Sequence, residues 1–348
     1  MHQQDRTGRL GVDASLGEAP VVALVGPTAS GKSEIAFEVA LSSGWPQRIP
    51  HGELGVELVS IDSMAVYRDM DIGTAKPSAE RRRRVRYHLV DLVDPCEEFT
   101  VLQFQEAARR SLADISRRGH RALLVGGTGL YLRSVVDDLT FPGRYPVTAA
   151  DLAAALEAAG PPGSPGEREA LVGLHRQLTR LDPVAAGRME PANRRRLLRA
   201  LEVTLGSGRP FSSFGPGLER YPPSAVVQVG IRHDPAVLDQ RIADRFDRWM
   251  DLGLLEEVRS LRERPGGVSR TARQALGYRE LLSHLEDGVP LSDAVDQAIR
   301  RTMAFARRQM AWFRRDPRIV WMTPDDDPVG WIAARLGPAS PGPAAVGE

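Results

Sequence analysis

The sequence predicts an α/β fold, a parallel sheet flanked by helices, with an inserted all-helical domain. Strand-like runs at Glu57–Ile61 and Ala122–Val125 lie on either side of a helical stretch, Val101–Arg118. From about Tyr145 onward, helical patterns separated by Pro and Gly follow one another until Ala225–Ile231 again has the character of a strand. Alternating strands and helices are typical of a parallel sheet covered on both faces. A helical block that interrupts such a sheet indicates an inserted module.

The first strand leads into a specific motif. The apolar run Val21–Val25 is followed by G-x-x-x-x-G-K-S, which consists of Gly26, Pro27, Thr28, Ala29, Ser30, Gly31, Lys32 and Ser33, and a helical pattern begins at Glu34. This order is typical of a P-loop, whose N–H groups, lysine and helix N-terminus bind phosphate and whose Ser hydroxyl binds Mg²⁺. We therefore expect a P-loop NTPase-like, nucleotide-kinase-like core that binds a phosphorylated ligand, with Mg²⁺ at Ser33. A chance Gly-rich turn is the alternative.

Composition narrows the class further. The 348 residues include 46 basic and 45 acidic side chains, so net charge favours no particular partner. Arginines cluster at 81–84, 194–196, 307–308 and 314–315, which is typical of solvated helix faces or of an RNA partner. Cys96 is the only cysteine, which excludes disulfides within the chain. No segment has the ~20 apolar residues of a membrane span, and the N-terminus lacks a signal-peptide pattern, so we expect a cytoplasmic protein without a membrane partner.

These patterns divide the chain into successive parts. The polar N-terminus and the Pro-, Gly- and Ala-rich C-terminus are typical of disordered ends. The predicted order is a disordered N-terminal extension (1–19), the first part of the catalytic core (20–144), a helical insertion (145–223), the second part of the core with C-terminal helices (224–337) and a disordered tail (338–348).

Five further motifs give the chain a family resemblance. They are D-S-M-A-V-Y-R at 62–68, M-D-I-G-T-A-K-P at 70–77, G-G-T-G-L-Y at 126–131, Q-A-L-G-Y-R-E at 274–280 and R-R-Q-M-A-W-F-R-R at 307–315. With these motifs in this order, the chain resembles the tRNA dimethylallyltransferases, which prenylate N6 of adenosine 37, next to the anticodon of tRNA. The resemblance covers roughly residues 20–325. Two features depart from the family: the loop Gly44–Gly55 is longer than usual, and Ala65 stands where Gln is common.

The resemblance implies that an adenine amine attacks C1 of dimethylallyl diphosphate and that diphosphate leaves. Fixed donors must then stabilise the leaving diphosphate, and a base must take a proton from the amine. Lys32 and the P-loop N–H groups suit the first task. Arg241 completes the clamp by similarity to a family arginine, with a surface ion pair as its alternative.

Two further residues are expected at the reacting atoms. Asp62, at the end of the neighbouring strand, is expected to be the general base, with a role as Mg²⁺ ligand or helix N-cap as alternatives. Thr128, on a Gly-flanked turn, is expected to line the channel where the amine meets the prenyl carbon. A helix N-cap is its other reading, and the two roles can coexist.

The family analogy also implies a set of residues that face the tRNA. The set is Asp62, Ser63, Met64, Ala65, Asn193, Arg194, Arg195, Arg196, Leu197, Gln274, Gly277, Tyr278 and Arg279. The three consecutive arginines suit phosphate contact, while Gln274 and Tyr278 suit hydrogen bonding to, and stacking on, an unstacked base. For Trp312 and Phe313 we expect a packing role in the core or at an interface, with stacking on RNA as the alternative. We assign no metal to the scattered histidines.

The expected function is transfer of a dimethylallyl group from dimethylallyl diphosphate to N6 of adenosine 37, by a monomer whose partner is the tRNA anticodon stem-loop. A related prenyltransferase that acts on free adenine nucleotides would use the same chemistry. A P-loop small-molecule kinase is a further alternative, although it leaves residues 71–77 and the arginine-rich insertion unexplained.

Overall fold

The computed structural model describes residues 21–42, 55–215 and 217–337. The predicted extension at 1–19, the tail at 338–348 and all but the last residue of the 44–55 loop lie outside the described residues. The chain divides into two compact units. The described residues up to Asp138 and from Tyr221 onward form the sheet unit, and those from Leu139 to Arg220 form the helical unit. The range expected for the insertion, 145–223, starts and ends a few residues later.

The sheet unit contains one sheet of six parallel strands in the order β3-β2-β4-β1-β5-β6, which confirms the predicted parallel sheet. The strands are β1 (Val22–Val25), β2 (Val56–Ile61), β3 (Tyr87–His88), β4 (Arg121–Gly126), β5 (Val227–Ile231) and β6 (Ile319–Met322). Because β4 lies between β1 and β2, the expectation that Asp62 follows the strand next to the P-loop strand is wrong. Sequence periodicity missed β3 and β6, since both are short edge strands.

Helices form the rest of the regular structure. They are α1 (Lys32–Ser42), α2 (Ala79–Arg84), α3 (Val101–Arg117), α4 (Gly129–Val136), α5 (Pro146–Ala158), α6 (Pro165–Leu181), α7 (Pro183–Ala186), α8 (Arg194–Ser207), α9 (Pro235–Asp251), α10 (Leu254–Glu263), α11 (Tyr278–Asp287), α12 (Leu291–Phe313) and α13 (Pro328–Leu336), with 3₁₀ turns η1 (Phe211–Phe214), η2 (Ala272–Gln274) and η3 (Pro324–Asp326). Helices α5, α6, α7, α9 and α13 begin with Pro, whose fixed φ and missing N–H suit the first helical position. No helix in the described ranges is long and apolar enough to cross a membrane.

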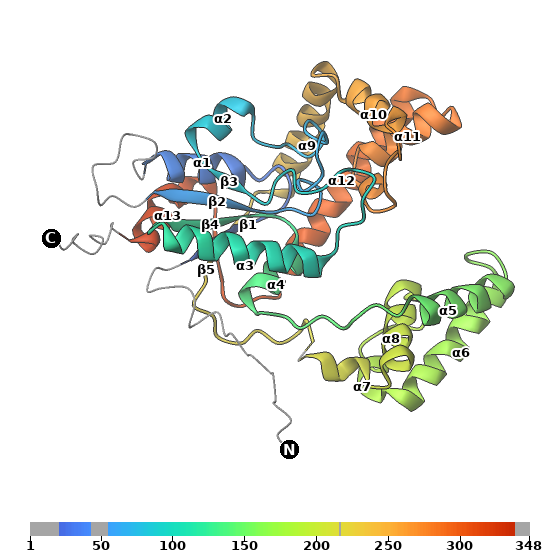
Figure 1. The fold of residues 1–348 in the computed structure, drawn as a ribbon. Helices are drawn as coiled ribbons and strands as arrows, with labels where there is room; N and C mark the ends of the chain where they lie inside the picture. Colours follow the sequence, from blue (N-terminus) through green and yellow to red (C-terminus); the bar gives the residue numbers. More distant parts are fainter. Residues whose placement is uncertain (1–20, 43–54, 216, 338–348) are drawn as a thin grey trace. The chain divides into compact units, whose positions relative to one another are not determined.

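Both faces of the sheet are buried. Along β1, Val22 and Leu24 belong to one hydrophobic core and Ala23 and Val25 to another, because successive side chains of a strand point to opposite faces. Helices α1 and α13 pack on the first core, and α3 and α4 pack on the second (Figure 1). Burial on both faces explains why β1 is apolar throughout.

The helical unit has a core of its own. Leucines from α5, α6 and α8 meet there, and Leu156, Leu178, Leu197 and Leu201 are at most 1% exposed. Helices α5, α6, α7 and α8 are coloured green to yellow in Figure 1. This group is the helical block that the Pro- and Gly-punctuated sequence predicted.

Candidate active site

Three strands deliver the candidate residues to the same edge of the sheet. Val25 of β1 is in register with Gly126 of β4, which is in register with Ile61 of β2. The loops that follow these strands therefore leave the sheet at the same level. We call them the P-loop (26–33), the glycine loop (126–129) and the Asp62 loop (62–68).

The P-loop has the backbone that its sequence predicts. Gly31 adopts φ +85°, which L residues rarely adopt, just before α1 begins at Lys32. The Lys32 ammonium donates to the Pro27 carbonyl at 3.0 Å. The Ser30 hydroxyl is buried without a partner among the described atoms, whereas the Ser33 side chain at the start of α1 is exposed.

Helix α9 brings arginines to the P-loop. Arg241 Nε donates to the Ala29 carbonyl at 2.9 Å, and Arg245 Nη1 donates to Thr28 Oγ1 at 3.2 Å. No ion pair of Arg241 occurs within the described ranges, so the surface-pair alternative is not what this structure shows. Sequence reasoning named Arg241 and missed Arg245, although the four-residue spacing on one helix was a usable signal.

Positive charge at the P-loop is not neutralised locally. Burial lowers the pKa of Lys32 to about 8, with the charge of Arg245 acting in the same direction and that of Asp62 opposing it. Burial, together with Arg241 and Arg248, lowers the pKa of Arg245 to about 10. An anion that binds beside such a cationic group stabilises its charged form. The site therefore favours a ligand with several negative charges.

Asp62 sits at the start of a turn. Its Oδ1 accepts hydrogen bonds from the backbone N–H groups of Met64 at 2.7 Å and of Ala65 at 3.3 Å. The helix N-cap alternative is wrong, because no helix begins there. Within the part of the chain that the structure describes, Oδ2 makes no hydrogen bond. One oxygen thus fixes the carboxylate while the other is available to a substrate.

Thr128 connects the glycine loop to the Asp62 loop. It occupies the N-cap position of α4, but its side chain makes no cap hydrogen bond. Instead, Thr128 Oγ1 accepts from the Ser63 N–H at 3.2 Å, while the Thr128 N–H donates to the Ile61 carbonyl at 3.2 Å. The alternative of a side-chain cap is therefore wrong, and the Thr128 hydroxyl joins the glycine loop to the Asp62 loop.

Residues of α12 complete this edge. Gln309, which sequence reasoning did not single out, bonds to the P-loop at Thr28 N and to the glycine loop at Gly127 O. Trp312 packs against Gly129 so closely that a Cβ there would lie 2.1 Å from its Nε1. The predicted packing role of Trp312 is confirmed, and Phe313, at 2% exposed, belongs to the core.

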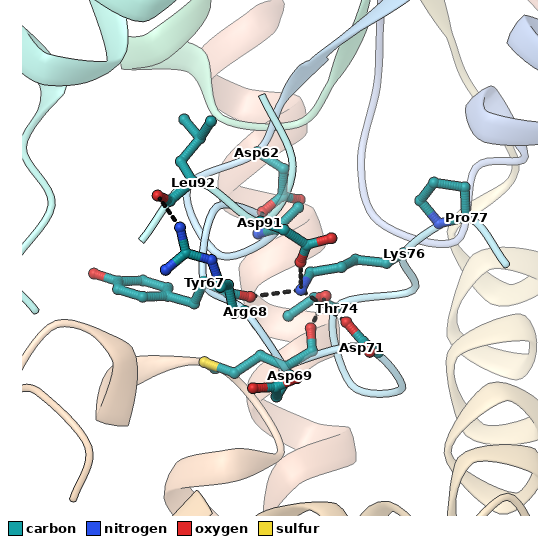
Figure 2. A network of polar contacts seen from close by, with 12 residues as sticks. Asp62, Tyr67, Arg68, Asp69, Asp71, Thr74, Lys76, Pro77, Asp91 and Leu92 are labelled. Carbon is teal, nitrogen blue, oxygen red and sulfur yellow. Dashed lines mark hydrogen bonds and ion pairs between the residues drawn. The ribbon is translucent and has the colours of Figure 1, made fainter. Parts of the chain in front are cut away.

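The D-I-G-T-A-K-P motif has a structural role that the sequence did not reveal. Figure 2 shows the Lys76 ammonium, whose side chain is 1% exposed, at the centre of a polar network. Lys76 Nζ lies 2.5 Å from the Tyr67 carbonyl, 2.6 Å from Asp91 Oδ1 and 2.8 Å from Asp71 Oδ1. A buried ammonium with three acceptors is satisfied, so Lys76 joins the 70–77 segment to the Asp62 loop.

Glu257 of α10 anchors the same segment. Its carboxylate accepts from the N–H groups of Asp71 at 3.0 Å and Ile72 at 2.9 Å, and from the Tyr278 hydroxyl at 2.5 Å. The Tyr278 ring packs against Gly73 and is 2% exposed. Burial and the neighbouring Glu257 carboxylate raise the pKa of Tyr278. The expectation that this ring stacks on a base is therefore corrected: it is a packing residue.

The remaining RNA candidates of the sheet unit differ in exposure. Gln274 and Arg279 are exposed and lie 3.4 Å apart through Oε1 and Nη1. Gly277 has φ +87° and precedes α11. Ala65 is 5% exposed, so its short side chain offers little to a ligand where the family often has Gln.

In the helical unit, the candidates surround the start of α8. Asn193 caps this helix by accepting from the Arg196 N–H at 3.3 Å, and Arg194 pairs with Glu167 at 3.1 Å. Leu197 is completely buried in the core of the unit, which corrects its place among the RNA-facing side chains. Arg195 and Arg196 are exposed and have no ion pair among the described side chains.

The described residues hold no cluster of three or more His, Cys, Asp or Glu side chains that could bind a metal by themselves. His233 Nε2 donates to the Ser30 carbonyl oxygen at 2.8 Å, and His88 Nε2 lies 2.5 Å from Oε2 of buried Glu57. His175 lies near backbone carbonyls of the helical unit. Each of these three histidines thus has a hydrogen-bond partner within the fold.

A P-loop at the carboxyl edge of a parallel sheet, with cationic side chains converging from α9, is the arrangement typical of proteins that bind a phosphorylated ligand. Comparison with known proteins narrows this class. The family model described as IPP transferase matches residues 65–316. The chain belongs to the IPP transferase family, which confirms the resemblance seen in the motifs.

Individual relatives support this assignment. A tRNA dimethylallyltransferase of Desulforudis audaxviator is 43% identical over 89% of this chain and 94% of its own length, and one of Thermobifida fusca is 41% identical over 88% and 90%. The crystal structure of a tRNA isopentenylpyrophosphate transferase from Bacillus halodurans, 32% identical, covers 92% of this chain and 97% of its own with a TM-score of 0.61. A eukaryotic dimethylallyltransferase acting on tRNA, 22% identical, shares the fold with a TM-score of 0.65 over 88% of this chain and 75% of its own.

Proposed function

We propose that the protein transfers a dimethylallyl group from dimethylallyl diphosphate to N6 of adenosine 37 in tRNA and releases diphosphate. The observation that carries this proposal is a cationic P-loop at the same edge of the sheet as the carboxylate of Asp62, whose charge acts on Lys32. The loops that carry the two groups leave the sheet at the same level, after β1 and β2, and the charge of Asp62 acts against the lowering of the Lys32 pKa. The names of relatives that are 41–43% identical over most of the chain support the same reaction.

The P-loop side of the reaction needs charge stabilisation. As the C1–O bond of the prenyl donor breaks, the electron pair and a negative charge move to the leaving diphosphate. Hydrogen bonds to the P-loop already fix the side chains of Lys32, Arg241 and Arg245. These side chains therefore lose little freedom when that charge develops. A departing diphosphate matches the several negative charges that the site favours.

Residues at the start of α1 fit Mg²⁺. The Ser33 hydroxyl is exposed and has no protein partner within the described ranges, as a P-loop metal ligand requires. Since Mg²⁺ keeps several waters and takes phosphate oxygens of the substrate, the protein need supply only a few of its ligands. When bound, the ion would neutralise part of the charge on the diphosphate.

The acceptor side needs proton removal. The adenine amine is a weak nucleophile, because its lone pair is delocalised into the ring. As the N6–C1 bond forms, Asp62 Oδ2 would take the proton, while Oδ1 stays bound to the turn. Adenosine 37 must leave its stack to reach this carboxylate, at a cost of a few kcal/mol.

We further propose that Arg195 and Arg196 of the helical unit contact tRNA phosphates. Both side chains are exposed and form no ion pair among the described residues, and an arginine that is already paired gains less from a phosphate.

We also propose that the protein acts as a monomer in the cytoplasm.

The test is a transfer assay with competing acceptors. Purified protein, Mg²⁺ and radiolabelled dimethylallyl diphosphate are incubated with unmodified tRNA, with AMP and with ATP in parallel. We expect label in tRNA alone. Label in AMP or ATP would retain the chemistry and overturn the acceptor, whereas ATP hydrolysis without any transfer would indicate a kinase-like enzyme.

A further inference from the structure

Gln309 of α12 is a buried polar residue at the candidate site to which the reaction assigns no role. Its side chain is 8% exposed and makes two hydrogen bonds. Oε1 accepts from the Thr28 N–H at 2.9 Å, and Nε2 donates to the Gly127 carbonyl at 2.8 Å. Because one partner is a donor and the other an acceptor, the orientation of the amide follows from the partners. A single side chain thus holds both the P-loop and the glycine loop.

Glycine at position 127 permits this close approach of the amide. A Cβ on Gly127 would lie 2.3 Å from Gln309 Nε2, so any side chain there would displace the amide from its present position. On its other side, Thr28 is held through its hydroxyl by Arg245 at 3.2 Å. The P-loop is therefore fixed at one residue both to α9 and to α12.

The hydrogen bonds continue toward the proposed base. Gly127 precedes Thr128, whose hydroxyl accepts from the Ser63 N–H at 3.2 Å. Ser63 follows Asp62, and Asp62 Oδ1 holds the turn that comes next. An unbroken path of covalent and hydrogen bonds thus leads from the diphosphate loop through Gln309 to the carboxylate.

We propose that Gln309 is a positioning residue, which sets the distance between the P-loop and the glycine loop and thereby couples diphosphate binding to the acceptor side of the site. The inference rests on the proposed transfer reaction, because it concerns the alignment of the prenyl donor with the amine. A displacement of about 1 Å between reacting groups can lower a rate about a hundredfold. Loss of Gln309 therefore slows the chemical step more than it weakens the binding of either substrate.

The principal variant is Gln309→Met, which keeps the length and volume of the side chain and removes both hydrogen bonds. Its matched control is Gln105→Met. Gln105 is also a buried helical glutamine, at 2% exposed, and donates at 2.6 Å to the carbonyl of Ser134, which belongs to none of the three loops. Both variants lose buried hydrogen bonds, so their melting temperatures report the structural cost common to the two.

The kinetic arm compares kcat with KM. We expect Gln309→Met to lower kcat tenfold to a hundredfold, with KM for tRNA and Kd for inorganic diphosphate within about threefold of the wild type. Gln105→Met should keep kcat within about twofold. If Gln309→Met changes kcat no more than the control does, Gln309 is only a packing residue and the inference is wrong.

A second variant covers the case in which Gln309→Met does not fold. Gln309→Glu still accepts from the Thr28 N–H, loses the donor to Gly127 and places a carboxylate oxygen opposite the Gly127 carbonyl, so kcat should again fall at least fivefold. An unchanged kcat in this variant would also overturn the inference.

Hydrogen exchange tests whether Gln309 couples the two loops without requiring the transfer reaction. Inorganic diphosphate with Mg²⁺ should slow exchange in peptides that cover residues 26–33 and 126–131 of the wild type, and only in the first peptide of Gln309→Met. Protection of both peptides in the variant would show that Gln309 does not couple the loops. This readout needs no transfer activity, so it stands even if the proposed reaction fails.

Discussion

The hydroxyl of Thr128 lies 3.2 Å from the backbone nitrogen of Ser63 and accepts its hydrogen bond. This contact joins the glycine loop to the residue that follows Asp62. Thr128 therefore contributes to the site by holding a loop, whether or not its hydroxyl also meets a substrate.

Substitution of Thr128 distinguishes the methyl group from the hydroxyl. Thr128→Val keeps the shape and loses the acceptor, so we expect kcat to fall about fivefold, as for a hydrogen bond of about 1 kcal/mol. Thr128→Ser retains the acceptor and should stay within about threefold of the wild type. Equal activity of the Val variant and the wild type in the transfer assay would remove the loop tie from the account.

Asp62→Asn separates the two oxygens of the carboxylate. The amide oxygen can still accept from Met64 and Ala65, but the side chain no longer takes a proton. We expect kcat to fall about 10²–10⁴-fold, with tRNA affinity nearly unchanged in filter binding. Asp62→Ala should lose the turn as well and melt at a lower temperature. A large loss of tRNA affinity in the Asn variant would make Asp62 an RNA contact in place of a base.

Diphosphate affinity should depend on Lys32 ionisation. Burial lowers the pKa of Lys32 to about 8 in the free protein, and a bound anion favours the charged form. The protein therefore takes up a proton on binding, and its affinity declines as the pH rises above about 8. Calorimetry in buffers of different ionisation enthalpy measures this uptake. Lys32→Arg, which stays charged, is the control, because the titration of diphosphate itself is common to both proteins. Identical proton uptake by the two would contradict the prediction.

The arginines of α8 should differ in their effect on tRNA binding. Arg194 already pairs with Glu167 at 3.1 Å, whereas Arg195 and Arg196 are exposed. We expect Arg195→Ala and Arg196→Ala each to reduce the slope of log K against log salt by about 1, and Arg194→Ala to change it less. If all three slopes equal that of the wild type, the run is only a solvated helix face.

A buried charge outside the site should govern acid stability. Burial acts to raise the pKa of Glu57, but hydrogen bonds from His88, Arg118 and His120 outweigh it and lower the pKa to about 2. A carboxylate with a lowered pKa stabilises the fold above its ordinary pKa of 4.5, and this contribution is lost as the pH falls from there toward 2. Glu57→Gln should lower the free energy of unfolding at neutral pH by about 3 kcal/mol and flatten the acid limb of the stability profile. A variant as stable as the wild type would show that the cluster is energetically neutral.

Local patterns in the sequence predicted the parallel sheet, the P-loop and the helical block, because each of these features depends on residues that are consecutive in the chain. Contacts between distant residues could not be predicted in this way. Gln309 meets Thr28 across 281 positions of the chain, and Glu257 meets Asp71 across 186. The motif around Tyr278 was visible, but its burial against Gly73 depends on how α11 packs. Sequence therefore located the loops, while tertiary packing decided which side chains reach them.

The most direct test of the account is to map the transferred group on an anticodon stem-loop. The protein is given dimethylallyl diphosphate and either a stem-loop with adenosine 37 or one with guanosine at that position. The products are then digested to nucleosides and analysed by mass spectrometry. The account predicts one dimethylallyl group on N6 of adenosine 37 and none on the guanosine-containing loop. Modification of a different nucleotide, or of both loops equally, would contradict it.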